Sequence, residues 1–541
     1  MAHEETATFQ TRYHISASII LDSSLHIGSG ETDTRSLDDT TEKSQVSTIV
    51  RDYRNKPYIP GSTLRGLLRD LMEHNQNITK DTIKALFGTG EENNECGGKL
   101  RFANAYFNET QSNLSKPDNE HILKEDQEDC QGLLLKKIDI KEYKRRHWDE
   151  NRWSWIINGV AIDRCTGSAA EHRLFFYEAV PPGTVFTLGI EAIGLGEDDI
   201  ELLFKTLSFL KKENNLILGR GQAVGFGKCH IGDDICLHGI TDKNALHKWL
   251  ENHSAAGLNS LPKLSAPGIN TPLAQKNNTV TLHVTLKFNG PLLVNDPSST
   301  YKNPKKNEAG LGHVYLSDHK NRIFLPGTSF KGAFRSQMER IVRTMGDRIN
   351  GKVLSPQESS NLACYPSGEK ELCCPDINKK DDIAEKLCLV CRICGGRGYR
   401  SPLMVSEFSA KEGKEGELRL QDFVAIDRFT GGVAGDKKFN ALHREDPELT
   451  GSITLDCDRI DEPLLGLFFL TLRDLIEGDI AFGYGKTKGF GYCTAEVTLK
   501  EESNNMFPSQ SLSEDEAWLA AAVPQVKELE KIIENTLTKE V

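Results

Sequence analysis

The chain has 541 residues, of which 38% are hydrophobic, and it carries a formal net charge of −12 at pH 7. Its length exceeds what one hydrophobic core normally supports, and its acidic balance argues against indiscriminate nucleic-acid binding while leaving room for a local basic groove. Because no apolar run approaches the roughly 18 residues of a membrane span and the start lacks a leader-like pattern, we expect a cytoplasmic protein without a membrane partner.

Each half of the chain is predicted to open with an alternating apolar strand, at 14–20 and again at 280–288. A Pro-Gly motif then leads into a helix, which in the first half runs from Ser62 to about Glu73, with Ser62 or Thr63 as its N-cap. A second helix, at 198–212 and 462–477, precedes a glycine-rich segment and a last strand. This order is that of a ferredoxin-like α+β unit, whose open sheet face is a common platform for single-stranded RNA.

Three motifs occur twice in the same order, which indicates a tandem duplication of one domain. They read IPGSTLRG and LPGTSFKG, AIDR and AIDR, and GRGQAVGFGK and GYGKTKGFGY, at 59–66 and 325–332, 161–164 and 425–428, and 219–228 and 483–492. We therefore expect two tandem ferredoxin-like (RRM-like) domains with long insertions. The predicted boundaries are a first domain at 1–250, a linker at 251–277, a second domain at 278–500, and an acidic helical tail at 501–541, whose helix 514–537 is interrupted at Pro524.

Cations follow the Pro-Gly turn at matching positions, namely Arg65 and Arg69 in the first repeat and Lys331 and Arg335 in the second. The free N–H groups of a helix N-terminus beside such cations form a ready phosphate site, although an ordinary capped surface helix is the alternative.

The glycine-rich segments place four glycines within nine residues, which permits positive φ angles and close approach of the backbone to a ligand. The cations interleaved with them are Arg220, Lys228, Lys486 and Lys488. Each segment follows a helix and opens into a strand, the reverse of the order in dinucleotide-binding and P-loop motifs.

Six of the thirteen cysteines lie between 364 and 394. Cys388 and Cys391 have the spacing that lets two thiolates chelate one zinc ion, and Cys364 with Cys373 or Cys374 would complete a tetrahedron. A thioredoxin-like redox motif is the weaker alternative, because it should follow a strand and open a long helix.

Together, the Pro-Gly, AIDR and glycine-rich motifs resemble the repeat-associated mysterious proteins (RAMPs), the superfamily that builds CRISPR effector complexes. The chain resembles two fused copies of the type III backbone subunit that lines guide RNA, as in type III-D-like complexes. The resemblance implies guide RNA, complementary target RNA and other effector subunits as partners. It also implies a zinc finger in the second repeat, in which Cys394 packs and is not a ligand, and no zinc in the first repeat.

Carried over by position, the resemblance implies guide-phosphate contacts at the Pro-Gly helix starts, made by Ser62, Arg65, Arg69, Ser329, Lys331 and Arg335. It further implies that 162–167 and 426–431, with Arg164 and Arg428, form the base of a thumb hairpin. In this family the hairpin inserts between guide and target and flips one base pair at regular intervals, which bends a phosphodiester out of helical geometry.

Cleavage in the family resembles a metal-dependent attack by the 2′-hydroxyl, helped by an aspartate in the loop after the first strand, so a divalent cation such as Mg²⁺ is implied. The loop 28–50 offers Asp33, Asp38 and Asp39, and an insertion leaves the register between Asp38 and Asp39 open. The second repeat offers Asp296.

Three functions are compatible with these features: a target-cleaving backbone subunit, a scaffold with inert aspartates, or a guide-processing ribonuclease. The third is disfavoured because neither repeat shows paired histidines near its first helix.

Overall fold

The structure is a computed structural model. It describes residues 9–36, 43–75, 77–89, 96–112, 148–149, 152–163, 168–212, 215–252, 261–267, 278–296, 313–317, 322–355, 357–365, 373, 383–396, 398–500, 511–513 and 517–538.

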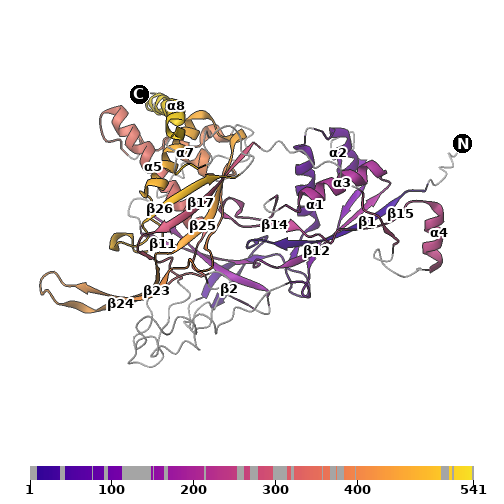
Figure 1. Ribbon diagram of the computed structural model, residues 1–541, viewed down its shortest axis with the longest axis horizontal. Coiled ribbons are helices and arrows are strands. Elements are labelled where there is room, and N and C mark those ends of the chain that lie inside the picture. The colour runs from indigo at the N-terminus through magenta and orange to yellow at the C-terminus, as the bar shows by residue number, and fades with distance from the viewer. Residues whose placement is uncertain are drawn as a thin grey trace.

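The first repeat contains an antiparallel sheet that its helices cover on one face (Figure 1). Its strands are β1 (Arg12–Leu21), β4 (Tyr58–Ile59), β7 (Leu100–Phe102), β8 (Ala105–Phe107), β12 (Val185–Ile193), β13 (Leu216–Ile217), β14 (Lys228–Ile231), β15 (Cys236–Ile240) and β16 (Lys263–Leu264). Its helices are α1 (Gly61–Glu73), α2 (Lys80–Phe87), α3 (Glu197–Phe209), α4 (Lys243–Asn252) and the short 3₁₀ turn η4 (Gln222–Val224), and a small pair of strands, β5 (Gly88–Thr89) and β6 (Cys96–Gly97), follows α2.

The second repeat also contains an antiparallel sheet with helices on one face (Figure 1). Its main strands are β17 (Thr279–Phe288), β20 (Phe324–Leu325), β21 (Leu403–Val405), β22 (Phe408–Ala410), β25 (Glu448–Asp456) and β26 (Cys493–Leu499). Its helices are α5 (Gly327–Asn350), η7 (Ala384–Lys386), α6 (Leu389–Cys394), η8 (Cys457–Arg459), α7 (Glu462–Glu477), η9 (Lys486–Lys488) and α8 (Ala517–Thr538).

Both main sheets have the strand order of a ferredoxin-like unit. In the first repeat the order is β14-β1-β12-β8, and in the second it is β26-β17-β25-β22, so the first strand lies between the third and the last in each. Alternation sets the register: Ile15 pairs with Ile190 and Ile19 with Phe186, and all four side chains are buried under the helices. The predicted α+β class and strand–helix order are therefore found in both repeats.

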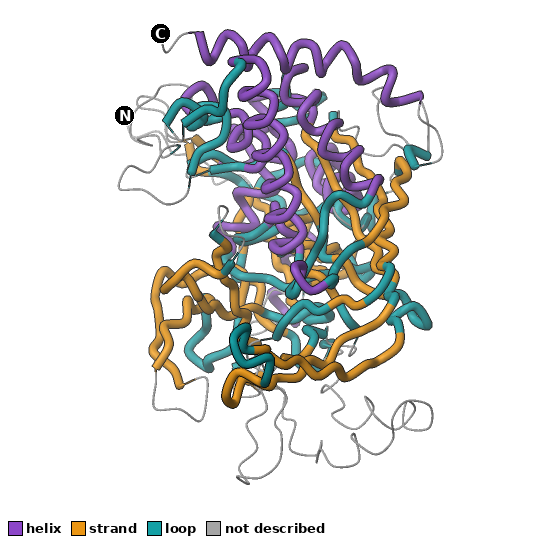
Figure 2. Tube along the Cα trace, turned by 90° about the vertical axis from the view of Figure 1, so that its left-hand side faces the viewer, coloured by secondary structure: helices purple, strands orange, loops and turns teal. Residues whose placement is uncertain are grey.

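Each repeat has a second, smaller sheet that includes a long two-stranded ribbon. The first comprises β2 (Gly28–Ser36), β3 (Lys43–Ile49), β9 (Trp148–Asp149), β10 (Ser154–Ile162) and β11 (Ala169–Ala179). The second comprises β18 (Pro291–Leu292), β19 (His313–Val314), β23 (Glu417–Ile426) and β24 (Val433–Glu445). The ribbon is β10–β11 in the first repeat and β23–β24 in the second. The β23–β24 ribbon extends far from the body of the second repeat (Figure 1), on the side away from its helices (Figure 2).

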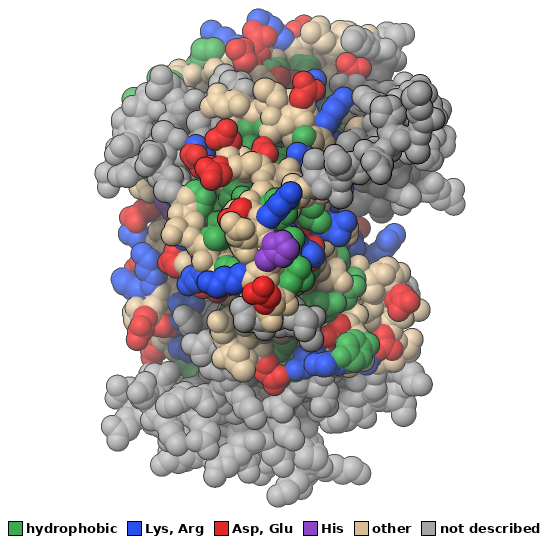
Figure 3. All heavy atoms as spheres, turned by 90° about the vertical axis from the view of Figure 1, so that its right-hand side faces the viewer, with side chains coloured by type: hydrophobic (Ala, Val, Ile, Leu, Met, Phe, Trp, Pro, Cys, Tyr) green, Lys and Arg blue, Asp and Glu red, His purple; other side chains and the backbone are tan. Residues whose placement is uncertain are grey.

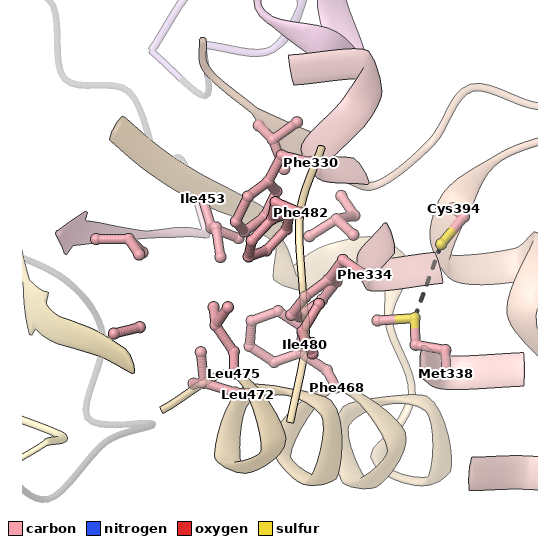
Figure 4. Close-up of a cluster of buried hydrophobic side chains, with 14 of the residues drawn as sticks. Phe330, Phe334, Met338, Cys394, Ile453, Phe468, Leu472, Leu475, Ile480 and Phe482 are labelled. Atoms are coloured by element: carbon pink, nitrogen blue, oxygen red, sulfur yellow. Dashed lines mark hydrogen bonds between the residues drawn. The ribbon is translucent and has the colours of Figure 1, made fainter. Parts of the chain in front are cut away.

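Aromatic side chains fill the core of the second repeat. Phe330 stacks on Phe408 and Phe482, with ring centroids 4.4 and 5.2 Å apart, and Phe334 meets Phe468 edge-on (Figure 4). Burying a side chain of this size contributes about 1.5–3 kcal/mol. These contacts fix α5 and α7 against the sheet.

The predicted elements agree with the structure where local signals are strong. Helix α7 spans the predicted residues because Asp461 caps its first turn, accepting from the backbone N–H of Leu464, and Gly478 ends it with a φ of 90°. Two expectations are wrong. Helix α8 continues through Pro524 because it packs closely on α7, and Lys263–Leu264 of the predicted linker forms β16, which pairs with β15 of the first sheet.

Candidate functional site

The Pro-Gly turns begin both first helices, but no serine or threonine caps them. Helix α1 starts at Gly61 with Pro60 as its N-cap, and Asn104, from the loop before β8, accepts a hydrogen bond from the Gly61 N–H at 2.9 Å. A Cβ at Gly61 would lie 2.4 Å from the Phe102 carbonyl oxygen, so only glycine fits this close approach. The predicted cap at Ser62 or Thr63 is therefore wrong, and Ser62 remains exposed, as does Ser329 in the second repeat.

The cations of α1 lie at the surface of the first repeat. Arg69 pairs with Glu73 at 2.7 Å, and the two side chains are 37% and 43% exposed. Arg65 donates to the Phe87 carbonyl oxygen and is half-buried. Basic and acidic side chains are interspersed on the end face of this repeat (Figure 3). A ligand phosphate could therefore reach Arg69 by displacing an exposed carboxylate.

Lys331 of α5, at the position equivalent to Arg65, is only 8% exposed. Its Nζ donates to the Ser401 hydroxyl at 2.7 Å and to the Leu403 carbonyl oxygen at 2.8 Å. Burial lowers the pKa of Lys331 to about 8. Arg335, one turn later, points at the cysteines. Neither side chain is therefore placed for the guide-phosphate contact expected of it.

Four cysteines of the second repeat converge on one point. The Sγ atoms of Cys364, Cys373, Cys388 and Cys391 all lie within 4.8 Å of one another, and the Cys364 and Cys391 sulfurs are 3.5 Å apart. Zinc–sulfur bonds of about 2.3 Å in a tetrahedron separate sulfurs by about 3.8 Å, so this donor set fits a structural zinc ion. Cys374 lies outside the described residues. Cys394 packs against Met338 (Figure 4), as expected of a residue that is not a ligand.

Hydrogen bonding among these thiols shifts their acidities in opposite directions. Donation from Cys373, Cys388 and Cys391 lowers the pKa of Cys364, while the same sharing raises the pKa of Cys373 and Cys388. The pKa of Cys391 is lowered to about 7: the bond to Cys364 opposes this shift, whereas Cys373, Cys388 and Arg335 produce it. A metal ion would bind only the deprotonated thiols, so metal affinity at this cluster should depend on pH.

The two glycine-rich segments have the same backbone shape and different surroundings. In the first, glycines 219, 221, 225 and 227 have positive φ, and so do their counterparts 483, 485, 489 and 491. A Cβ at Gly225 would lie 2.9 Å from the Glu407 backbone nitrogen of the second repeat, whereas at Gly489 no described atom comes within 4 Å. A Cβ at Gly327 would likewise lie 2.2 Å from the Val224 carbonyl oxygen. The first glycine-rich segment is therefore docked on the Pro-Gly turn of the second repeat.

Cations of the glycine-rich segments differ in accessibility. Arg220 and Lys486 are exposed, while Lys228 is partly buried and its pKa is lowered by that burial. Lys488 lies over the rings of Phe423 and Phe439, its Nζ 4.8 and 4.4 Å from their centroids. Cation–π attraction thus holds Lys488 beside the root of the β23–β24 ribbon.

The two AIDR segments lie at the tips of the ribbons, not at their base as expected, because β10 and β23 run up to Ile162 and Ile426. At the second tip, the Asp427 carboxylate accepts from the backbone N–H groups of Phe429 and Thr430 at 2.8 and 2.9 Å, which lowers the pKa of Asp427. Arg428 is exposed and Phe429 is fully exposed. Arg164 lies outside the described residues.

The candidate catalytic aspartates have unequal positions. Asp38 and Asp39 lie outside the described residues, between β2 and β3. Asp33 lies in strand β2, opposite Val46, where a loop was expected, and it accepts from Arg35 at 2.9 Å. Asp296 is buried, and its backbone N–H donates to the Val314 carbonyl oxygen at 2.8 Å.

A buried charge cluster beneath β2 and β3 was not expected from the sequence. The fully buried Glu178 of β11 pairs with Arg35 at 2.6 Å, Arg51 at 3.3 Å and Arg152 at 3.6 Å. Although burial alone would raise the pKa of Glu178, Arg51 and Arg35 lower it. This network joins segments more than 100 residues apart, and it fixes the strands that flank Asp38 and Asp39.

The sequence model of the RAMP superfamily matches residues 18–230 and 285–494, one match in each repeat. The chain therefore belongs to the RAMP superfamily and contains two tandem regions of it. A comparison with curated proteins found no match. Membership in this family indicates a CRISPR-associated, RNA-binding subunit. Within the described part of the chain, no helix is long and apolar enough to cross a membrane.

Proposed function

We propose that this protein is a subunit of a type III CRISPR ribonucleoprotein effector in the cytoplasm. It lines guide RNA and cleaves bound complementary target RNA at regular intervals. The observation that carries this proposal is the pair of ribbons that the two ferredoxin-like units project, with the second ending in Phe429 fully exposed. An aromatic side chain held at the tip of a stiff ribbon can insert between stacked bases, where it would unstack one nucleotide.

Guide RNA would contact the cations that remain accessible around these elements. They are Arg69 at the first helix, Arg220, Lys486 and Lys488 in the glycine-rich segments, and Arg428 at the second tip. Contacts of this kind hold the sugar–phosphate backbone without reading sequence, which suits a subunit that accepts many guides.

Target cleavage is assigned to the segment between β2 and β3, where Asp38 or Asp39 would orient the 2′-hydroxyl of the unstacked nucleotide toward its own phosphodiester. A divalent cation bound there would supply charge stabilisation at the phosphate. Glu178 and its arginines hold together the two strands on either side of this segment.

A scaffold role is the second candidate for the second repeat. Its one candidate aspartate, Asp296, is buried, whereas a residue that acts on RNA must reach solvent. The first repeat alone would then cut the target.

Zinc is assigned to Cys364, Cys373, Cys388 and Cys391 as a structural ion. When bound, zinc would cross-link α6 to the segment before it. The first repeat has no counterpart to this cluster among its described residues.

Neighbouring effector subunits would use the two faces that the internal repeat contact leaves uncovered. These are the second glycine-rich segment around Gly489, where an added Cβ would meet no described atom within 4 Å, and the Pro-Gly turn at Gly61, whose close neighbours belong to its own repeat. A contact that joins unlike faces can continue from one chain to the next.

The experiment is a cleavage assay with the purified complex and its guide. We expect up to two cuts in complementary RNA, and Asp38→Ala, or Asp39→Ala if the register is shifted, should abolish one cut while target binding persists. Asp33→Ala tests the third candidate aspartate of this segment, on the adjoining strand. DNA of the same sequence should bind and survive, because it lacks the 2′-hydroxyl. If Asp33, Asp38, Asp39 and Asp296 can all be replaced without changing the cuts, the chain is a scaffold.

A further inference from the structure

Arg335 of α5 lies directly against the cysteine cluster. Its Nη2 donates to the Cys391 sulfur at 3.0 Å and approaches the Cys364 sulfur at 3.8 Å. The other edge of the guanidinium is held by Glu339, whose Oε1 accepts from Nε at 3.0 Å. The Arg335 side chain is 18% exposed and that of Glu339 is 1% exposed, so this pair is part of the interior.

The sulfurs divide into two groups by the donors that reach them. Backbone N–H groups serve two of them: Cys388 N–H donates to Cys373 at 3.1 Å, and the N–H groups of Cys364 and Cys391 donate to Cys388 at 3.5 and 3.4 Å. The guanidinium of Arg335 serves the other two, Cys391 and Cys364. Among the described residues, Arg335 thus supplies the N–H groups that reach Cys391 and Cys364, and the backbone supplies those that reach Cys373 and Cys388.

Charge gives a second reason for a cation at this position. Four thiolates around one Zn²⁺ leave two net negative charges, and three of these cysteines are more than nine-tenths buried. Buried charge without compensation is costly, and a guanidinium is suited to this role because it stays protonated and offers several donors in one plane. The thiols of Cys394 and Cys391, together with Glu339, raise the pKa of Arg335 although burial alone would lower it.

The first repeat carries the same arginine–glutamate pair without the cysteines. Arg69 and Glu73 occupy the positions equivalent to Arg335 and Glu339, four residues apart on the same helix, and both are partly exposed. The i,i+4 pair is thus common to both repeats, and among the described residues a thiol cluster covers it in the second repeat alone.

We propose that Arg335 is a positioning residue of the metal site, which donates to two of the ligand sulfurs and offsets one of their negative charges, while Glu339 fixes the guanidinium. This inference rests on the zinc site assigned under the proposed function. Residues that hydrogen-bond metal ligands typically change metal affinity by roughly 10- to 100-fold.

The test measures zinc affinity of the full chain by competition with a chromophoric chelator. We expect Arg335→Gln to bind zinc at least about tenfold more weakly than the wild type, and Arg335→Lys, which keeps the charge but loses the planar fork, to fall between them. Arg69→Gln is the matched control and should leave zinc affinity unchanged. In the cobalt-substituted protein, the thiolate-to-metal absorption band should shift in Arg335→Gln and not in Arg69→Gln.

An unchanged zinc affinity and cobalt spectrum in Arg335→Gln would overturn the role of Arg335 and leave the zinc site standing. If Arg335→Gln does not fold, Arg335→Lys decides, since wild-type affinity in that variant would also overturn the proposal. A wild-type chain that binds no zinc would overturn the site itself and this role with it.

Discussion

Helices α1 and α5 start from the same Pro-Gly turn and carry cations at the same positions, yet they use them differently. In α1, Arg65 and Arg69 lie near the surface and pair with groups of their own repeat. In α5, Lys331 is enclosed by Ser401, Leu403 and the first repeat, and its Nζ lies 3.5 Å from the Ala223 carbonyl oxygen.

The difference arises from what covers each helix. The docked glycine-rich segment of the first repeat and the cysteine-bearing segment before β21 both lie on the start of α5, whereas α1 has neither cover among the described residues. Matching cations in two repeats therefore identify a common ancestor. They identify a common ligand only when burial is also the same.

The largest expected effect follows from replacing two cysteines of the segment that covers the start of α5. Cys388→Ser with Cys391→Ser should abolish about one bound zinc per chain and unfold the second repeat at temperatures that leave the first intact. Structural zinc supplies on the order of 10 kcal/mol of apparent binding free energy in small sites. Metal analysis and thermal denaturation check this, with Cys236→Ser of the first repeat as the control. Zinc retained in the double variant would contradict the site.

Replacing Glu178 tests whether the buried charge cluster stabilises the first repeat, as a metal would stabilise the second. Glu178→Ala should cost about 3–5 kcal/mol, because it leaves buried arginines without their carboxylate. Since the pKa of Glu178 is lowered in the folded chain, its contribution is present at neutral pH and is lost as pH falls through that folded pKa. Urea denaturation of wild type and variant at pH 7 and at acid pH measures both. If the difference in free energy of unfolding between wild type and variant does not shrink in acid, the Glu178 carboxylate is not the source of this stability.

Burial of Lys331 predicts a second rise in stability with pH, in the alkaline range. Its folded pKa of about 8 lies below its ordinary 10.5, so the unfolded chain binds the extra proton between these values and stability should rise across them. The difference corresponds to about 3 kcal/mol. Lys331→Met should remove this rise, measured by denaturation between pH 7 and pH 11. The equivalent Arg65→Met should leave the rise in place.

The docking of the repeats is tested by two equivalent glycines. Gly225→Ala and Gly489→Ala both place a side chain at positive φ, which costs roughly 1–2 kcal/mol in either repeat. Only Gly225→Ala also drives a methyl into the Ser406–Glu407 backbone, which should add about 1–3 kcal/mol. The difference between the melting temperatures of the two variants measures the effect of disturbing the contact between the repeats. Equal shifts would show that this contact does not contribute to stability.

The smallest expected effect is on RNA. Arg69→Ala should weaken guide binding equally for all guide sequences and lower the slope of log affinity against log salt by about 1, as for one lost phosphate contact. Lys331→Met should leave that slope unchanged, because the Lys331 amine is enclosed by protein. Filter binding of guide RNA at several salt concentrations compares the two. A slope lowered equally in both would contradict the assignment of these cations.

The sequence by itself predicted the features that local signals encode. Periodicity and caps gave α7 its bounds, alternation placed β1 and β17, and repeated motifs indicated two related α+β units of the RAMP superfamily. Cysteine spacing also identified the candidate metal ligands, because a chelating pair three residues apart is set by local geometry.

Only the tertiary structure decided what these residues face. The cap of α1 comes from Asn104, 43 residues later in the chain, and the carboxylate of Glu178 pairs with one arginine from strand β2 and two from loops. The enclosure of Lys331 depends on the other repeat. Such contacts join residues far apart in sequence, so no local pattern records them. Their free energies depend on burial, which exists only once the chain has folded.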